Sequence, residues 1–376
     1  CLGLPGTLPV LNRRVLELAA RAALALGSSI SSFSKFDRKN YYYPDLPKNF
    51  QISQFDKPFA LGGHLDIWID GKQQRVGITR AHLEEDAGKL VHFEKDGFSG
   101  VDYNRTGVPL LEIVSEPDLR SPRQAYEYLK VLRGLMRWVG ASDCDMEKGS
   151  FRCDANISLR PSGSDRLGVK TEVKNMNSFR AVERALSYEV DRQTRILGEG
   201  GEIVQETRLY NDSNQKTFSM RSKEEAHDYR YFPEPDLPPV VLDDGWVEKI
   251  KNSLPELPAE RADRFRDEYG LSGYDASVLT ADRDISDFYE KAVGAHSNYK
   301  TVSNWVMVEL MGALNREGLE IIDSPVSPEN LGALVSLIDK KTISGKIAKE
   351  VFAVMLETGG DPDAIVKEKG LVQISD

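Results

Sequence analysis

Alternation between apolar and polar residues predicts several β-strands in the first two thirds of the chain. Residues 65–83 are expected to form a hairpin, because LDIWID alternates, Asp70-Gly71 is a strong two-residue turn signal and QQRVGITR returns. Residues 151–160, FRCDANISLR, alternate without interruption and predict a strand with one apolar and one polar face. Shorter alternating runs predict strands over 169–174, 202–210 and 217–221, the last two joined by a turn over 211–216.

Helical periodicity is found near the start, in the middle and throughout the last third of the chain. Asn12 can cap a helix that stops at Gly27, and Ser121-Pro122 begins a second helix that stops at Gly140. After Pro255 the composition changes, and helices are expected over 259–269, 284–293, 301–316, 328–340 and 346–356.

These patterns together predict an α+β fold: an antiparallel sheet covered by helices on one face, followed by a small all-helical domain. Residues 35–47 and 228–239 are rich in proline and aromatic residues and are expected to form loops without regular structure. Interleaved Arg, Lys and Tyr in the first loop suit an RNA end, although tyrosines that simply pack on the core explain it equally well.

Composition narrows the function classes. The 376 residues are 40% hydrophobic and 29% charged, which is typical of a soluble globular protein of two or three domains. The most apolar stretch, 15–26, is broken by Glu17 and Arg21, so no membrane span is predicted. A net charge of −10 argues against nonspecific coating of nucleic acid, but it allows a local basic patch. Three cysteines do not make a disulfide framework, which favours a reducing compartment.

The densest group of metal-binding and proton-handling side chains is residues 78–89, ITRAHLEEDAGK. Three consecutive acids, Glu84, Glu85 and Asp86, follow His82 and precede Lys89. A solvated helix with i,i+4 ion pairs would explain the same spacing. Because the predicted hairpin leads directly into this run, we favour a site at the end of a strand.

The polar faces of the later strands carry a second set of charged groups. Carboxylates alternate there with cations, an arrangement that could hold Mg²⁺ through oxygens while the cations contact phosphate. A charged face that is only solvated remains the alternative. The side chains are Asp154, Glu172, Glu206, Arg152, Lys170, Lys174 and Arg208.

Several common motifs are absent from the sequence. It contains no GxxxxGK[ST] loop, no GxGxxG opening a helix after a strand, and no GxSxG elbow. Five scattered histidines without a CxxC pair give no complete zinc signature. The basic run 342–349 is a candidate RNA contact, although a solvated helix start explains it as well.

Long runs in order along nearly the whole chain resemble one family. The runs are CLGLPGTLPVLN, SKFDRKNYYYPDLP, FQISQFD, GITRAHLEEDAGK, VPLLEIVSEPDLRSP, GSFRCDANISLRP, TEVKNMNSF, QETRLY and DYRYFPEPDLPP. They resemble the B subunits of the aspartyl/glutamyl-tRNA amidotransferases. The resemblance implies a protein that uses ATP and Mg²⁺ to phosphorylate the side-chain carboxylate of Glu or Asp on misacylated tRNA. Ammonia then displaces the phosphate, giving Gln-tRNA(Gln) or Asn-tRNA(Asn).

The resemblance also implies partners, a location and domains. The partners are the misacylated tRNA and two further subunits: the A subunit, a glutaminase that supplies ammonia through a tunnel, and the small C subunit. The expected location is a bacterial cytoplasm or, alternatively, an organelle. Residues 1–254 would be a cradle-shaped kinase/amidotransferase domain lacking the family's N-terminal strand, 255–368 a helical domain, and 369–376 the start of a C-terminal tail domain.

The resemblance assigns site residues by position. It implies Mg²⁺ ligands at Glu85, Asp154 and Glu172, and ATP contacts from Arg152, Lys170 and Arg208. The same pocket would be lined by Glu84, Asn156, Lys170, Lys174 and Arg208. His82 is expected to have a structural role or to support a ligand, because the family's metal-binding histidine belongs to the N-terminal strand. Cys1 would be the last member of a family zinc cluster and cannot hold Zn²⁺ alone.

Two other functions remain open at this point. The chain could be a noncatalytic RNA-binding scaffold for a glutaminase, with its acids in structural salt bridges. It could also be a metal-dependent hydrolase that uses the same acids without ATP.

Overall fold

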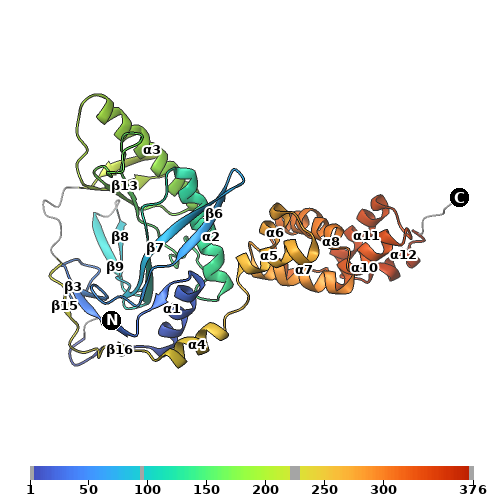
Figure 1. Ribbon diagram of the computed structural model, residues 1–376, viewed down its shortest axis with the longest axis horizontal. Coiled ribbons are helices and arrows are strands. Elements are labelled where there is room, and N and C mark those ends of the chain that lie inside the picture. The colour runs from blue at the N-terminus through green and yellow to red at the C-terminus, as the bar shows by residue number, and fades with distance from the viewer. Residues whose placement is uncertain (1–3, 94–96, 221–228, 372–376) are drawn as a thin grey trace. The chain divides into compact units, whose positions relative to one another are not determined.

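The computed structural model describes residues 4–93, 97–220 and 229–371 (Figure 1). The chain divides into two compact units, Cys1–Pro255 and Glu256–Asp376. The first combines sheets with helices and the second is helical, so the predicted α+β fold class is confirmed.

The largest sheet of the first unit is built around one long strand, β7 (Lys72–Glu85). The strand order is β1 (Ser29–Ile30), β5 (Ala60–Leu61), β7 and β10 (Pro109–Ser115), with β6 (His64–Ile69) also paired to β7. The β6–β7 hairpin confirms the predicted turn, where Asp70 and Gly71 have φ of 49° and 76°. Residues 78–85 of the run 78–89 therefore form the end of a strand and not a helix face.

One face of this sheet packs on the first helix, α1 (Arg13–Ala25). Ala81 and Leu83 of β7 are buried in the same core as Ala19 and Ala23 of α1. The Asn12 side chain accepts a hydrogen bond from the backbone N–H of Arg14, as the predicted cap requires. Because side chains alternate along a strand, the residues between Ala81 and Leu83 and beyond them project to the opposite face.

The second sheet corrects part of the prediction. Its order is β11 (Ala155–Ile157), β12 (Thr171–Lys174), β13 (Thr207–Asn211) and β14 (Lys216–Ser219). The predicted strand over 151–160 was too long, because a strand needs a paired partner and β12 pairs with only three of its residues. The β12–β13 pair is parallel and not antiparallel. The crossover that permits this is α3 (Phe179–Gly198), a helix that was not predicted from the sequence.

Both proline-rich loops are more regular than expected. β3 (Asp37–Asn40) lies inside 35–47 and pairs with β4 (Phe50–Ser53) and with β15 (Phe232–Pro233), which lies inside 228–239. β16 (Val240–Val241) then pairs with β2 (Phe33–Ser34). A separate hairpin joins β8 (Lys89–Phe93) to β9 (Phe98–Asp102). Residues 229–241 are therefore a strap that returns along the start of the unit.

Two more helices complete the first unit (Figure 1). α2 (Pro122–Trp138) begins at the predicted Ser121 cap and packs against β6 and α3. α4 (Asp244–Asn252) packs against α1. The helices thus pack against strands of the unit and against one another.

The second unit is a bundle of short helices around one core. Its elements are α5 (Pro258–Tyr269), α6 (Gly273–Leu279), α7 (Arg283–Ala295), α8 (Tyr299–Asn304), η1 (Trp305–Leu310), α9 (Met311–Glu317), η2 (Ile321–Asp323), α10 (Pro328–Asp339), α11 (Gly345–Thr358) and α12 (Pro362–Glu368). The helix predicted over 301–316 is interrupted by the π-helical turn η1. None of the described helices is long and apolar enough to cross a membrane.

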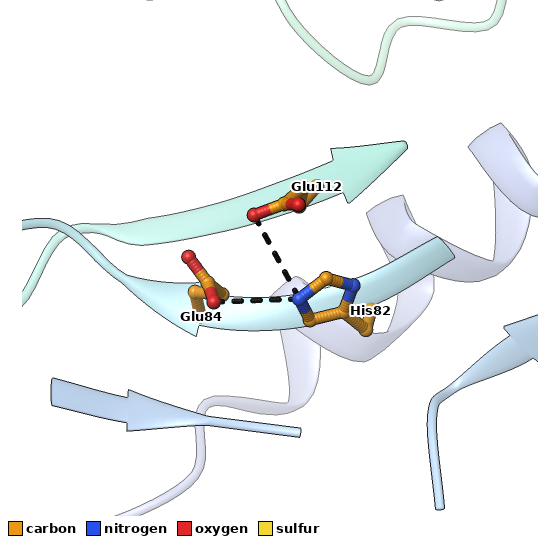
Figure 2. Close-up of side chains that lie close together, drawn as sticks. All are labelled: His82, Glu84 and Glu112. Carbon is orange, nitrogen blue, oxygen red and sulfur yellow. Dashed lines mark hydrogen bonds and ion pairs between the residues drawn. The ribbon is translucent and has the colours of Figure 1, made fainter. Parts of the chain in front are cut away.

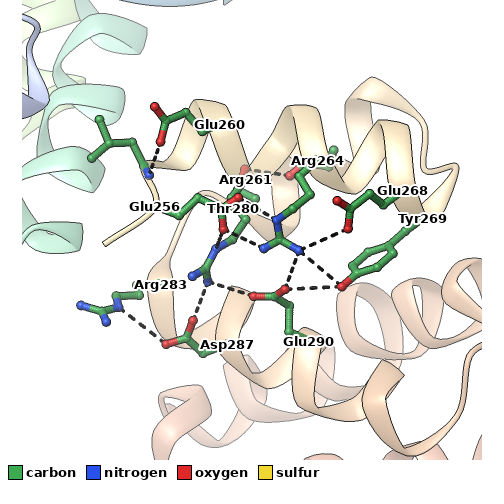
Figure 3. Close-up of polar contacts among 12 residues, drawn as sticks. Glu256, Glu260, Arg261, Arg264, Glu268, Tyr269, Thr280, Arg283, Asp287 and Glu290 are labelled. Carbon is green, nitrogen blue, oxygen red and sulfur yellow. Dashed lines mark hydrogen bonds and ion pairs between the residues drawn. The ribbon is translucent and has the colours of Figure 1, made fainter. Parts of the chain in front are cut away.

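Arginines and acids tie the first helices of this unit together (Figure 3). Arg261 forms ion pairs with Glu256 at 3.1 Å and with Asp287, and Arg264 pairs with Glu256 and Glu290, both at 2.7 Å. Because Glu256 precedes α5 while Asp287 and Glu290 lie on α7, the network connects both helices to the start of the unit.

Candidate functional site

A histidine and two glutamates meet on the polar face of the large sheet, near the end of β7 (Figure 2). His82 and Glu84 are two residues apart on β7, and Glu112 of β10 lies opposite His82 in the strand register. The His82 Nε2 atom is 3.3 Å from Glu84 Oε1 and 3.8 Å from Glu112 Oε2. We call these three residues the acid–histidine cluster.

Burial differs sharply across the acid–histidine cluster. The side chains of His82 and Glu84 are only 3% and 8% exposed, whereas that of Glu112 is 51% exposed. The buried Nδ1 atom of His82 has no hydrogen-bond partner. A buried polar atom without a partner is costly, and it often marks a place that a ligand or water completes.

Neighbouring polar groups hold Glu84 in its ionised form. Burial alone would raise the pKa of this carboxyl, but hydrogen bonds from His82 and Ser53 and the charge of Lys39 outweigh burial and lower the pKa. The Ser53 hydroxyl donates to Glu84 Oε1 at 2.6 Å, and Gln51 Nε2 donates to Oε2 at 3.2 Å. Glu84 is therefore a fixed anion.

Glu85 has a different environment. Its carboxylate forms an ion pair with Lys48 and accepts a hydrogen bond from the backbone N–H of Ile52 at 3.2 Å. Lys48 and Glu85 are 10% and 13% exposed, so the pair is largely buried. The predicted role of Glu85 as a Mg²⁺ ligand stays a prediction, and within this structure its charge is offset by a lysine that the sequence analysis did not name.

Asp86 links the end of β7 to the segment that leads into the second sheet. Its carboxylate pairs with Arg105 at 2.8 Å and with Arg152 at 2.6 Å. Arg152 lies two residues before Asp154 in the sequence. The two regions in which the sequence predicts site residues are thus joined through a direct ion pair.

The second sheet brings four of the predicted residues together. Lys174 Nζ lies 3.0 Å from Asp154 and 3.4 Å from Glu172, and Asn156 stands opposite Glu172 in the register. Burial lowers the pKa of Lys174, but Asp154 and Glu172 outweigh it and raise the pKa, so the amine stays charged. The exposed Lys170 directly precedes β12.

Arg208 is held inside the second sheet. Its guanidinium contacts Glu206 at 2.6 Å and the fully buried Glu189 of α3 at 3.1 Å, and it donates to the Thr217 backbone carbonyl at 2.9 Å. These contacts use most of its donors within the protein. An ATP-contacting role for Arg208 stays a prediction, and its present contacts are those of a structural residue.

The predicted site residues therefore fall into two groups, with Glu84 and Glu85 on β7 and the others around the second sheet, while Cys1 lies outside the described residues. Sequence reasoning missed Glu112, because register across the sheet, and not spacing along the chain, brings it to His82. Within the described parts of the chain, only the acid–histidine cluster brings ligand atoms of three His, Cys, Asp or Glu residues within 4.8 Å of one another. Two carboxylates beside one imidazole suit a divalent cation.

Comparison with known proteins assigns the chain to a family. Residues 1–248 match the model described as the GatB/GatE catalytic domain, and residues 287–376 match the GatB domain. The B subunit of the aspartyl/glutamyl-tRNA(Asn/Gln) amidotransferase of Carboxydothermus hydrogenoformans is 59% identical, and relatives of the same name from Persephonella marina and Moorella thermoacetica are 57% and 56% identical. Each match spans 100% of this chain and 79% of the relative. The chain therefore belongs to the family of aspartyl/glutamyl-tRNA(Asn/Gln) amidotransferase B subunits.

Proposed function

We propose that this chain activates the side-chain carboxylate of Glu or Asp on misacylated tRNA by phosphorylation from ATP, and that ammonia then displaces the phosphate. The products are Gln-tRNA(Gln) or Asn-tRNA(Asn). The proposal rests on family membership together with one observation, the acid–histidine cluster at the end of β7. It also places the enzyme among the translation components of the cytoplasm.

The reaction has an electrostatic difficulty that this site is suited to relieve. A carboxylate is a poor electrophile, and an anionic substrate must approach an anionic triphosphate. Phosphoryl transfer is catalysed mainly by positioning and by stabilising the charge that develops, and there is little covalent chemistry for the protein to perform. Cations placed around fixed carboxylates meet that requirement.

The acid–histidine cluster is the group that fits Mg²⁺ best. Glu84 and Glu112 offer carboxylate oxygens, the ligands that Mg²⁺ prefers, and a bound cation would offset the two negative charges that face one imidazole. His82 would orient Glu84 through its Nε2 atom, which agrees with the expectation that His82 supports a ligand. When bound, Mg²⁺ would neutralise phosphate charge, and the protein's own part is to hold Glu84 ionised and immobile through Ser53 and Gln51.

The remaining predicted residues take roles around this cluster. Asp154, Glu172, Lys174 and Asn156 form a polar surface that we assign to a second contact with phosphate or metal. The exposed Lys170, and Arg152 with its side chain half exposed, are placed to approach an anionic substrate. Glu85 keeps its proposed role as a Mg²⁺ ligand, and Lys48 would offset part of its negative charge.

The proposal extends to domains and partners. We assign the kinase/amidotransferase activity to residues 1–254 and a helical domain to 255–368. The ammonia would come from a glutaminase, the A subunit, with the small C subunit as the third member of the heterotrimer.

The test uses the complete heteromeric enzyme with the full-length chain. Glu84→Gln keeps the shape of the side chain but removes its charge, and it should reduce ATP-dependent phosphorylation of misacylated tRNA by at least about 100-fold. The measurement is transfer of the labelled γ-phosphate, with complex assembly and tRNA binding followed in parallel. The matched control is Asp66→Asn on β6, an acid paired with Arg75 in the same sheet, which should leave transfer unchanged.

Two other results would each reject the assignment. Unchanged phosphoryl transfer by Glu84→Gln in a normally assembled complex would favour a scaffold with structural salt bridges, of which the Lys48–Glu85 pair is an example. Turnover of the substrate without ATP would favour a metal-dependent hydrolase.

A further inference from the structure

Two aromatic rings form a stacked pair close to the acid–histidine cluster. The Phe55 and Tyr231 rings lie 4.2 Å apart between centroids with an interplanar angle of 10°, and Tyr229 meets Tyr231 edge-on at 6.1 Å. Phe55 follows β4, whereas Tyr229 and Tyr231 belong to the strap over 229–241. We call Phe55, Tyr229 and Tyr231 the aromatic wall.

The exposed ring of the aromatic wall is Phe55. It is 49% exposed although Tyr231 covers one of its faces, and Tyr231 itself is half-buried. An exposed aromatic ring that is already stacked on a partner is a flat apolar platform held at a fixed angle. Platforms of this kind stack nucleobases with little dependence on sequence.

Hydrogen bonds place this platform beside the acid–histidine cluster. Arg80, two residues before His82 on β7, donates to the backbone carbonyl of Phe55 at 2.9 Å. Gln54 accepts from the Leu83 backbone N–H at 2.9 Å, and Ser53 donates to Glu84 at 2.6 Å. Residues 53–55 therefore run along β7 beside the residues of the cluster.

The electrostatics of Tyr231 agree with this placement. Burial raises the pKa of Tyr231 to about 12, and Glu84 and Glu112 act in the same direction while Arg80 opposes them. The Tyr231 hydroxyl thus lies within electrostatic reach of both glutamates of the acid–histidine cluster.

Cations flank the aromatic wall. Lys39 Nζ lies 4.9 Å from the Tyr229 ring centroid. Arg80 contacts the wall at Phe55 through the carbonyl hydrogen bond. Positive groups beside an aromatic platform suit a ligand that combines a base with phosphates.

The strap that carries the tyrosines is fixed by an almost completely buried acid. Glu234, 3% exposed, accepts two hydrogen bonds from Arg38, at 2.7 and 2.9 Å. The Asn40 backbone N–H donates to the Tyr229 carbonyl at 2.9 Å, and the Asn40 side chain donates to the Arg230 carbonyl at 2.8 Å. The aromatic wall is therefore held in place before any ligand binds, which reduces the entropy cost of binding.

From this geometry we propose that the aromatic wall stacks an unpaired adenine of the substrate on the exposed face of Phe55. The adenine belongs either to ATP or to the 3′ end of the tRNA. The assignment rests on the proposed function, which brings both adenines to this site. It goes beyond that function by naming a base-binding surface outside the carboxylates and cations of the site.

The test measures stacking directly in the complete heteromeric enzyme. One probe is tRNA whose 3′-terminal adenine is replaced by 2-aminopurine, and the other is 2-aminopurine riboside triphosphate. The fluorescence of 2-aminopurine falls when the base stacks, so quenching and Kd are read without any chemistry taking place. Quenching of one probe and not the other identifies the source of the adenine.

The inference predicts how substitutions of Phe55 change the quenching and the Kd of the probe. Phe55→Ala should abolish the quenching of that probe and raise its Kd about tenfold. Phe55→Leu, which keeps apolar volume without an aromatic face, should behave like Phe55→Ala, whereas Phe55→Trp should retain quenching. The matched control is Phe98→Ala, since Phe98 is 56% exposed and stacked on Phe93 at 4.7 Å in a separate hairpin.

The contrary outcomes are distinct. If neither probe changes with Phe55→Ala or Phe55→Leu in an assembled complex, the inference is wrong. Failure of Phe55→Ala and Phe55→Leu to assemble, while Phe55→Trp assembles, would show that a partner protein covers the aromatic wall and would also overturn it. If quenching depends on Phe55 but phosphoryl transfer survives Glu84→Gln, the base-binding surface stands and the proposed function fails.

Discussion

Two clusters of charged side chains in this chain differ in whether each acid has a cationic partner. In the helical unit, the acids that link α5 to α7 each have an arginine partner: Arg261 and Arg264 share Glu256 and Glu290, and Asp287 is paired with Arg261 and Arg283 (Figure 3). In the acid–histidine cluster, two carboxylates face the Nε2 atom of a single imidazole. Balanced charge is typical of a structural network, whereas excess negative charge indicates a group that a cation completes.

This difference teaches that the density of charged residues in a sequence is a poor guide to function. Both clusters contain more than one acid, and what distinguishes the structural cluster from the candidate site is the set of partners that these acids have. Removing one residue from the balanced network should lower stability, whereas removing the half-exposed acid of the acid–histidine cluster, Glu112, should lower activity and leave stability nearly unchanged or slightly improved.

The largest effect on stability is expected from Arg261→Ala. Arg261 is only 10% exposed at its side chain and pairs with Glu256, Asp287 and Glu290, so its loss leaves three acids close together. The helical unit should lose about 3 kcal/mol of unfolding free energy, measured by urea denaturation of the full-length chain. The control Arg266→Ala removes an exposed i,i+3 pair with Asp263 and should cost under about 0.5 kcal/mol. Equal losses for both variants would contradict the structural role of the network.

A smaller loss is expected from Arg38→Ala in the first unit. The change leaves the buried Glu234 without its bidentate partner and should lower the unfolding free energy by about 2 kcal/mol. Glu234→Gln in the same background should recover part of the loss, because a neutral amide is less costly to bury than an unpaired carboxylate. No recovery would mean that the arginine stabilises the strap by packing and not by charge.

The balanced network should also respond to pH. A hydrogen bond from Arg264 lowers the pKa of Glu256 below its ordinary value of 4.5. A lowered pKa in the folded state means that this stabilisation is complete above about pH 4.5 and is lost as pH falls through the folded pKa. Unfolding of the helical unit should therefore become easier in acid, and Glu256→Gln should flatten that dependence. A variant with the wild-type pH profile would assign the acid sensitivity to other groups.

The smallest stability effect is expected in the acid–histidine cluster. Glu112→Gln removes one of two like charges and should raise the unfolding free energy by up to about 0.5 kcal/mol in the absence of divalent cations. Added Mg²⁺ should stabilise the wild type more than the variant, since a ligand that binds the native state raises its stability. A clear loss of stability in the variant would show that Glu112 is needed for the fold.

The sequence was sufficient for the parts of the fold that depend on local chemistry. The turn at Asp70-Gly71, the caps at Asn12 and Ser121 and the helical composition after Pro255 each follow from neighbouring residues, and the structure confirms them. The parallel β12–β13 pair and the pairing of β3 with β15 were not predictable in this way. They join segments far apart in the chain, and no local pattern records which strands become neighbours.

The residues of the candidate site also divide into those that local sequence patterns predict and those that only the folded chain brings together. The alternating strands already put Asp154, Glu172 and Lys174 on polar faces, and the structure joins them. Glu112 and Lys48 reach the end of β7 only through the register of β10 and the path of the chain before β4, so spacing could not reveal them. Glu84 and Glu85 are adjacent and identical in type, but they differ in their partners: Glu84 contacts His82 and Ser53, whereas Glu85 pairs with Lys48.

The Mg²⁺ dependence of phosphoryl transfer tests the central claim most directly. The complete heteromeric enzyme would be assayed for ATP-dependent phosphorylation of misacylated tRNA across a range of Mg²⁺ concentrations, with the wild-type chain and with Glu112→Gln. If the acid–histidine cluster holds the cation, the Mg²⁺ concentration for half-maximal transfer should rise about tenfold or more in the variant, with activity partly recovered at high Mg²⁺. An unchanged Mg²⁺ dependence in an assembled, tRNA-binding complex would contradict the account.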